Sequence, residues 1–191
     1  MKKIIILLFL LTTSCAAPSF DKRVDYIYEL NDNKFGEFVY KNSFKIYSLQ
    51  KINNNEKVVV YIEGDGLSWI DRFTPSSDPT PKNPLAFKLA KLDQNQNVIY
   101  LARPCQYIQS NRCQREIWTK LQYSNEIMAN YTNILKELKN KHSEVHLVGY
   151  SGGSVIAMYL ASIKELNIKS VRTVAGNIKP NEFTQLLNIS P

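Results

Sequence analysis

Histidine is scarce in this sequence of 191 residues: there are two, His142 and His146, and none follows them. Cysteine occurs three times, glycine seven times and proline eight times. So few cysteines and histidines make a poor zinc site, and we expect no metal and no cofactor. The low glycine and proline content excludes a collagen-like chain, and the sequence contains no internal repeat.

The chain also lacks a dense lysine–arginine run and any alternation of basic with aromatic residues, so nothing specific supports nucleic-acid binding. The formal net charge is +7. Without Lys2 and Lys3, which lie in a segment that we expect to be removed, the 24 basic residues become 22 against 17 acidic ones, a net charge of +5. This excess favours contact with anionic membranes or envelope polymers, although a solvated lysine-rich face has the same composition.

The apolar run from Ile4 to Leu11 is too short to span a bilayer. With two lysines before it and small polar residues after it, the run is typical of a secretory signal peptide. The ending Thr12–Cys15 resembles a bacterial lipobox, although Thr12 stands where leucine is usual. It predicts a signal peptide over residues 1–14 and lipidation of Cys15. A signal peptide cut after Ala17 and a buried N-terminal helix are the alternatives.

We therefore expect an exported protein of the cell envelope, anchored in the membrane by lipid at Cys15. A soluble periplasmic or secreted protein is the alternative. Residues 15–24 would be a tether and residues 25–191 one domain. Export places a chain in an oxidising compartment, where Cys105 and Cys113 could close a short loop, which stabilises by about 2–3 kcal/mol. Two free thiols are the other possibility.

Apolar strands alternate with helices along the remaining chain. Alternating polar and apolar residues predict a strand pair over 35–52. Apolar runs predict buried strands over 58–62, 97–104, 144–150 and 168–178. Helical spacing predicts helices over 84–92, 117–139 and 151–166, and the tail has room for one more short helix. This order predicts an α/β fold with a doubly wound, mostly parallel sheet.

A Gly-x-Ser-x-Gly motif, Gly149 to Gly153, stands between the strand over 144–150 and the helix after it. In this context Ser151 would occupy a strained turn, for which the flanking glycines leave room. The Gly152 N–H, at the start of the helix, would donate to a developing oxyanion. A chance turn without chemistry is the alternative, and a phosphate-binding loop is disfavoured because no Gly-Lys-Ser/Thr is present.

A second oxyanion donor is expected from the turn Glu63-Gly64-Asp65-Gly66, which follows the first parallel strand. Asp65 or Gly66 is the candidate, and a tight turn without function is the alternative. Asp65 would be a poor triad acid because it precedes the serine in a layout where the acid follows it.

The order of four strand-end motifs, Glu-Gly-Asp-Gly, "LARPCQY", "GYSGG" and "TVAGNI", resembles bacterial exported α/β-hydrolases over about residues 55–185. In that family the segment 103–107 and Trp118 match recurring positions. The resemblance implies the α/β-hydrolase fold, Ser151 as nucleophile, Gly152 and the 63–66 turn as oxyanion hole, and a Cys105–Cys113 bridge. The family tends to carry an acidic residue after "AGN", where this chain has Ile178-Lys179.

A serine nucleophile needs a base, and α/β-hydrolases supply an acid and then a histidine after the serine. Here the last carboxylate is Glu182, and both histidines precede Ser151. Five extended residues separate His146 from Ser151, roughly 16 Å, whereas a hydrogen bond spans about 3 Å. We expect both histidines to be structural or solvated, and Lys164 and Lys169 to lie at the wrong end of their helix–strand unit.

The sequence therefore predicts an α/β-hydrolase-like domain that lacks its last strands and the triad Asp and His, descended from a serine esterase or acyl hydrolase with a small ester or acyl substrate. It would have weak or no activity. The loss of later strands would also bare the edge of the fourth parallel strand. Three interpretations are open: an active hydrolase completed by an outside or unusual base, a non-catalytic envelope lipoprotein, and a binding module that uses the pocket over "GDGLSW".

Overall fold

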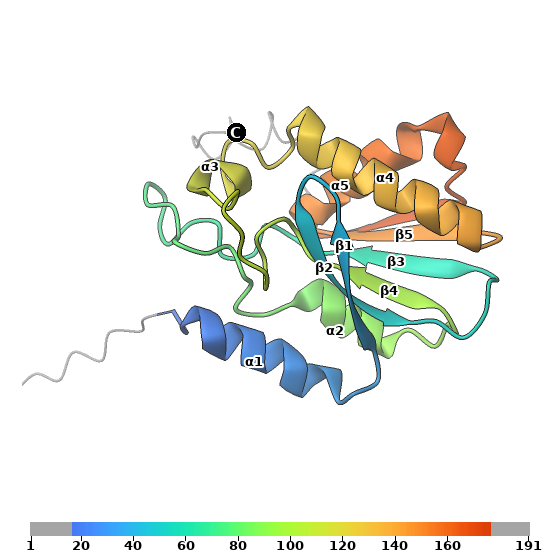
Figure 1. Cartoon of the computed structure of the whole chain (residues 1–191), viewed down its shortest axis with the longest axis horizontal. Helices are drawn as coiled ribbons and strands as arrows, with labels where there is room; N and C mark the ends of the chain where they lie inside the picture. The colour runs from blue at the N-terminus through green and yellow to red at the C-terminus, as the bar shows by residue number, and fades with distance from the viewer. Residues whose placement is uncertain (1–16, 177–191) are drawn as a thin grey trace, which may run out of the picture.

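The computed structural model describes residues 17–176, so the predicted signal peptide, Cys15 and the tail after "AGN" lie outside the described residues. One sheet has helices on both faces (Figure 1). Its strands are β1 (Gly36–Lys41), β2 (Lys45–Lys51), β3 (Val58–Ile62), β4 (Val98–Leu101), β5 (Val145–Tyr150) and β6 (Ser170–Val174). The helices are α1 (Phe20–Asn31), α2 (Leu85–Leu92), α3 (Arg115–Trp118), α4 (Asn125–Lys141), α5 (Gly152–Ser162) and the 3₁₀ turn η1 (Lys164–Leu166).

The six described strands lie in the order β1-β2-β4-β3-β5-β6. Strands β4, β3, β5 and β6 pair in parallel, while β1 and β2 form an antiparallel hairpin that joins β4. Parallel neighbours require crossover connections, and α2, α4 and α5 provide them. The predicted strand pair and the doubly wound, mostly parallel α/β sheet are confirmed.

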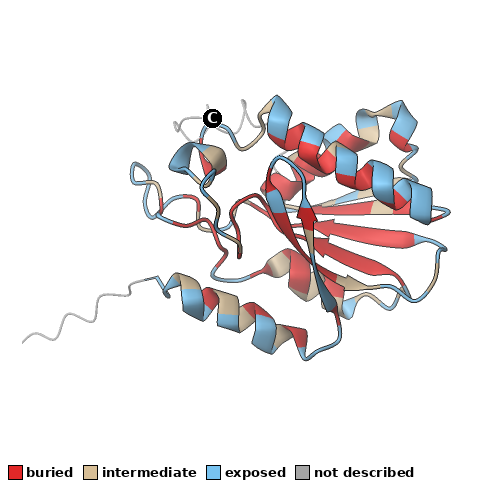
Figure 2. Ribbon diagram, viewed as in Figure 1, coloured by how far each residue is buried: buried red, intermediate tan, exposed pale blue. Residues whose placement is uncertain are grey.

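The central strands β3, β4 and β5 are largely buried on both faces because they alternate side chains between two cores. In β3, Val58, Val60 and Ile62 belong to the core under α4 and α5, whereas Val59 and Tyr61 belong to the core under α1 and α2. Figure 2 shows β3 and β4 buried along their length, while β5 is buried except at His146 and Tyr150, which are intermediate. A strand covered on both faces needs a continuous apolar run, which is why "VVVYI" carries no polar residue.

Residues 20–24, predicted as part of a tether, are instead the first turns of α1, which Ser19 caps. The buried positions of this helix are Arg23, Ile27 and Asn31, spaced four residues apart. Two of the three are polar, so a search for apolar periodicity does not find this face.

Polar contacts replace the missing apolar ones on α1. Arg23 forms an ion pair with Asp78 and donates to the Thr80 carbonyl at 2.7 Å. Asn31 donates to the Phe35 carbonyl at 2.8 Å and accepts from the Phe35 N–H at 3.0 Å. Buried polar groups are stable only with such partners, so α1 is fixed to the loop that follows β3.

The single helix predicted over 117–139 is in fact two helices, because α3 ends at Trp118 and α4 begins at Asn125. Between them the Gln122 carbonyl accepts a hydrogen bond from the Arg103 guanidinium at 2.8 Å. A continuous helix would use that carbonyl internally and deprive Arg103, which is buried, of an acceptor. A tertiary contact therefore interrupts the helical pattern.

Cys105 and Cys113 form a disulfide, with their Cα atoms 5.6 Å apart, so the predicted pairing is confirmed. The bond closes the loop that leads from β4 toward α3. From this loop, the Tyr107 N–H donates to the hydroxyl of Thr80, in the connection between β3 and α2, at 3.0 Å. The cross-linked loop is thereby joined to the segment 78–80, whose Asp78 and Thr80 are also the partners of Arg23.

Cys113→Ser is expected to lower the free energy of unfolding by about 2–3 kcal/mol, because the unfolded chain gains loop freedom. Urea unfolding followed by circular dichroism measures the change. Dithiothreitol should destabilise the wild type by a similar amount and leave the variant unchanged. A wild type that is insensitive to the reductant would contradict the bridge.

Candidate active site

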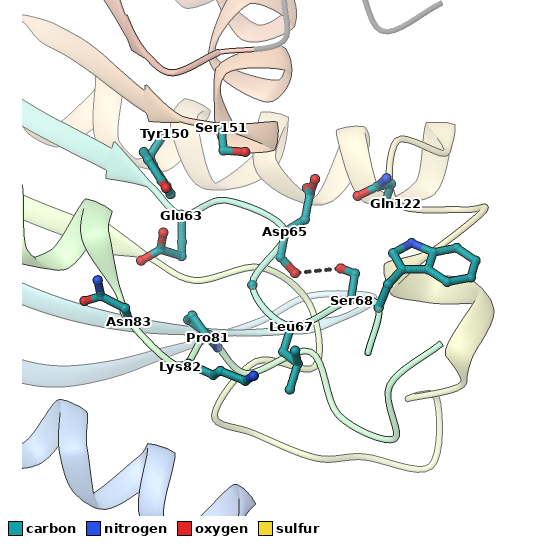
Figure 3. Close-up of a pocket in the computed structure, with 12 residues that line it drawn as sticks. Glu63, Asp65, Leu67, Ser68, Pro81, Lys82, Asn83, Gln122, Tyr150 and Ser151 are labelled. Atoms are coloured by element: carbon teal, nitrogen blue, oxygen red, sulfur yellow. Dashed lines mark hydrogen bonds between the residues drawn. The ribbon is translucent and has the colours of Figure 1, made fainter. Parts of the chain in front are cut away.

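Ser151 occupies the bend between β5 and α5, with a backbone φ of 49° and ψ of −122°. A non-glycine residue at this φ costs on the order of 1–3 kcal/mol. Two hydrogen bonds hold the bend: the Ser151 N–H donates to the Val174 carbonyl, and the Ser151 carbonyl accepts from the Ser154 N–H, both at 2.9 Å. The strained turn expected from the motif is present, and its side chain lines a cavity (Figure 3).

The glycines on either side of Ser151 are required by close backbone contacts. A Cβ at Gly149 would lie 2.5 Å from the Ser154 Cα, and one at Gly153 would lie 2.3 Å from the Ile62 carbonyl oxygen. Real Cβ atoms do not approach backbone this closely, so any larger residue would force α5 away from the end of β3.

The turn after β3 packs directly against the serine. Ile62 is the register partner of Gly149, so the residues that follow the two strands emerge at the same edge of the sheet. A Cβ at Gly64 would lie 3.1 Å from the Ser151 Cβ. A Cβ at Gly152 would lie 1.9 Å from Asp65 Oδ1, so this carboxylate lies against the first residue of α5. The structure thus brings the two sequence motifs together.

Three backbone N–H groups near Ser151 donate no backbone hydrogen bond within the described residues. Within residues 17–176, the N–H groups of Asp65, Gly66 and Gly152 have no hydrogen-bond acceptor. Asp65 and Gly66 line the cavity that holds Ser151, and Gly152 is the first residue of α5. An oxyanion hole consists of such donors when they point at the oxygen of the reacting carbonyl, so these three N–H groups remain the candidates.

The Asp65 side chain is engaged by a buried cation rather than by the serine. Its Oδ1 accepts from Arg103 at 2.8 Å and from the Tyr123 hydroxyl at 3.4 Å. Burial by itself lowers the pKa of Arg103, but the Asp65 carboxylate and the nearby tyrosines outweigh it and raise that pKa. The guanidinium also stacks over the Tyr123 ring, 5.2 Å from its centroid. Sequence reasoning missed Tyr123, which carries no motif of its own.

Glu63 is a second carboxyl group in the same turn, with 1% of its surface exposed. Its Oε1 accepts from the N–H groups of Gly64 at 2.9 Å and Ala86 at 3.4 Å, and its Oε2 accepts from the Tyr100 hydroxyl at 3.2 Å. Burial outweighs these hydrogen bonds and raises the pKa of Glu63 to about 7. In the sequence, the one sign of this buried carboxyl group is that an acidic residue directly follows the apolar run of β3.

The cavity over Ser151 has a volume of about 440 Å³. Its wall combines carboxylates, amides and a lysine with apolar side chains (Figure 3). The lining residues are Glu63, Asp65, Gly66, Leu67, Ser68, Trp69, Pro81, Lys82, Asn83, Gln122, Tyr150 and Ser151. A pocket of this size accommodates a small organic substrate.

Neither histidine is a partner of Ser151. His146 lies near the start of β5, opposite Ser170, and a ring nitrogen lies 2.7 Å from the Ser170 hydroxyl. His142 follows α4, and its Nδ1 lies 3.1 Å from the Glu56 carbonyl. In the described part of the chain, the Ser151 hydroxyl has no side-chain hydrogen-bond partner, and no three His, Cys, Asp or Glu residues are grouped to hold a metal ion.

No protein-family model and no curated protein sequence matches this chain. A protein of unknown function from Agrobacterium tumefaciens, described as a candidate α/β-hydrolase, superposes with a TM-score of 0.52 and 14% identity over 79% of this chain and 65% of that one. A candidate lipase from Acinetobacter baumannii AYE gives a TM-score of 0.50 and 17% identity over 92% and 56% of the two chains. The thioesterase domain of the curacin biosynthetic pathway gives 0.46 and 19% identity over 81% and 53%.

The chain thus spans between about half and two thirds of the length of these structures. At such identities the likeness concerns the fold and not the activity. The sheet order, the crossover helices and the serine bend at the end of β5 agree with it. The described residues have the α/β-hydrolase fold.

Proposed function

We propose that this chain carries the nucleophile and the oxyanion hole of a serine esterase or acyl hydrolase. The observation that carries the proposal is Ser151 on a strained bend, with the Gly152 N–H and the 63–66 turn beside it. The serine oxygen would attack an ester carbonyl. The resulting oxyanion would accept from Gly152 and from Asp65 or Gly66, and its collapse would expel the alcohol.

The serine proton needs an acceptor, and the described residues place no imidazole at Ser151. A base and an acid would have to come from outside these residues. We therefore propose that the chain on its own is at best weakly active. Triad enzymes deprived of a member retain roughly 10³–10⁴-fold acceleration from the oxyanion hole and substrate binding alone.

A non-catalytic envelope protein that binds a ligand in the same cavity is the second candidate. The engagement of both histidines at the far end of β5 favours it, because neither is available for proton transfer. A ligand bound in the cavity would then stay bound in Ser151→Ala.

We also propose that the protein is exported and anchored in the membrane by lipid on Cys15. The basic and apolar residues before Cys15 support export. The Cys105–Cys113 disulfide is typical of oxidising compartments. In residues 17–176, no helix has the length and hydrophobicity needed to cross a bilayer.

A fluorophosphonate probe tests the nucleophile. We expect slow labelling of the folded protein at Ser151, located by mass spectrometry and abolished in Ser151→Ala. His146→Ala is the matched control, and its labelling should equal that of the wild type because His146 lies at the other end of β5. A folded protein that does not label at all would contradict the hydrolase proposal and favour the binding protein.

The buried Glu63 predicts a pH-dependent stability. Its folded-state pKa of about 7 exceeds the ordinary 4.5, so the folded state holds the proton more tightly than the unfolded state. Stability should therefore be greatest below the ordinary pKa, fall as the pH rises from about 4.5 to 7, and level off above that.

Glu63→Gln keeps an acceptor for the two N–H groups and cannot ionise. At pH 8 we expect the variant to unfold with a free energy higher than that of the wild type by on the order of 3 kcal/mol. The advantage should vanish near pH 4. Urea unfolding across this range measures it, and a difference that does not change with pH would refute the assignment.

A further inference from the structure

Residues 69–74 form an exposed turn in the long connection between β3 and α2, and we call them the hairpin tip. Its apolar side chains are unusually open: Ile70 is 64% exposed and Phe73 is 83% exposed, while Trp69 is 40% exposed. Single exposed apolar residues are common, but three gathered in one short turn mark a contact surface.

Hydrogen bonds hold the hairpin tip in shape. Trp69 and Pro75 form an antiparallel bridge, and the Ile70 N–H donates to the Thr74 carbonyl at 2.8 Å. Asp71 accepts from the backbone N–H groups of Phe73 at 2.8 Å and Thr74 at 2.9 Å. The turn is therefore built to keep Ile70 and Phe73 outside the protein core.

The hairpin tip adjoins the candidate active site. Trp69, at its base, lines the same cavity as Ser151 and Asp65. A surface that covered the hairpin tip would therefore lie at the edge of this cavity. A substrate held in that surface would have a short path to the serine.

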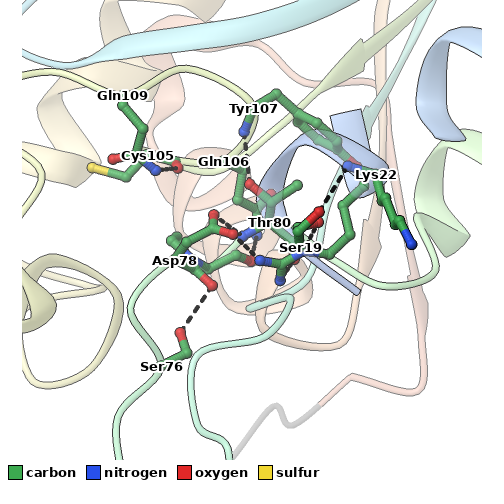
Figure 4. A network of polar contacts seen from close by, with 11 residues as sticks. Ser19, Lys22, Ser76, Asp78, Thr80, Cys105, Gln106, Tyr107 and Gln109 are labelled. Atoms are coloured by element: carbon green, nitrogen blue, oxygen red, sulfur yellow. Dashed lines mark hydrogen bonds and ion pairs between the residues drawn. The ribbon is translucent and has the colours of Figure 1, made fainter. Parts of the chain in front are cut away.

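The start of the described chain is tied to the base of the hairpin tip. Arg23, in the first turns of α1, pairs with Asp78 and donates to the Thr80 carbonyl, and its Nε donates to the Ser19 carbonyl at 3.4 Å. Figure 4 shows Ser19 beside Asp78 and Thr80. The start of α1 and the hairpin tip project toward the same side of the molecule (Figure 1). Cys15 precedes Ser19 by four residues, which span at most about 14 Å.

The charge near the hairpin tip suits an anionic surface. Arg72 lies within the turn, and Lys82 is an exposed residue that lines the cavity. The one acidic residue of the turn, Asp71, accepts hydrogen bonds from the backbone. Basic side chains near a bilayer of anionic lipids contribute about 1 kcal/mol each.

We propose that the hairpin tip docks into the surface of a lipid bilayer, with Ile70 and Phe73 at the boundary between the headgroups and the acyl chains and the cavity at the membrane face. The bilayer is the one that holds the lipid on Cys15, so the inference rests on the proposed anchor. It deepens the proposed function, because the substrate would then be an ester of a membrane lipid. Anchor, hairpin tip and cavity would face a single surface.

Fluorescence quenching by brominated lipid tests the docking with the full chain. The protein is added to vesicles of equal parts phosphatidylcholine and phosphatidylglycerol, with or without bromine on the acyl chains. The chain has two tryptophans, Trp69 at the hairpin tip and Trp118, which is 5% exposed and supplies a constant background. We expect bromine to quench Trp69 in vesicle-bound protein.

The double variant Ile70→Ser/Phe73→Ser should lose at least half of this quenching. Leu92→Ser is the matched control, because Leu92 is 73% exposed on α2 and lies outside the hairpin tip; its quenching should equal that of the wild type. Equal quenching in all three proteins, a loss in the control alone, or wild-type protein that binds vesicles without quenching would overturn the proposal. So would wild-type protein that does not sediment with these vesicles.

Ser151→Ala separates this inference from the hydrolase proposal, because the serine is not needed for docking. Suppose that bromine still quenches Trp69 in Ser151→Ala, and that Ser151 of the wild type does not react with fluorophosphonate. This pair of results would support the membrane contact and refute the hydrolase. Slow fluorophosphonate labelling of Ser151 in solution, with no quenching of the wild type on vesicles, would support the hydrolase and refute the membrane contact.

Discussion

The parallel pairing of β3 with β5 is the constraint on which the candidate site depends. It places Ile62 opposite Gly149, so the turn after β3 and the bend after β5 leave the sheet side by side. A one-residue slip would turn the buried side chains of β3 to the wrong faces, and the two cores therefore fix the register. The apolar packing of the sheet thereby sets the position of Ser151 relative to its candidate oxyanion donors.

Above this edge of the sheet, buried charges replace apolar packing. Arg103 joins Asp65 to the Gln122 carbonyl, and Arg23 joins α1 to Asp78. In the Arg23–Asp78 pair both side chains are buried, so the loss of one partner would cost about 3–5 kcal/mol, because the other charge is left without compensation. The loops around the cavity are therefore held in defined positions although they contain little regular structure. The same contacts explain why α3 and α4 are separate helices.

In the described residues, the candidate site has possible oxyanion donors but no imidazole at Ser151 to accept its proton. The candidate oxyanion donors lie near the serine, whereas the two imidazoles are engaged at the opposite end of the sheet. The nearest carboxyl groups are engaged elsewhere: Asp65 is paired with Arg103, and Glu63 accepts hydrogen bonds from Gly64, Ala86 and Tyr100. Under the proposed function, the cavity beside the Ser151 bend would hold an acyl group near a lipid surface, and proton transfer would be supplied from outside the described residues.

Local pattern determined the elements whose residues agree with their surroundings. The apolar run "VVVYI", the alternation over 35–52 and the glycines around Ser151 predicted the buried strand, the hairpin and the bend, because each follows from the chain's own periodicity or sterics. Tertiary structure decided the rest. The helix α1 is docked by Arg23 and Asn31, whose acceptors lie in other loops, and the break before α4 exists because Arg103 needs the Gln122 carbonyl. No local pattern reports a partner that is distant in the sequence.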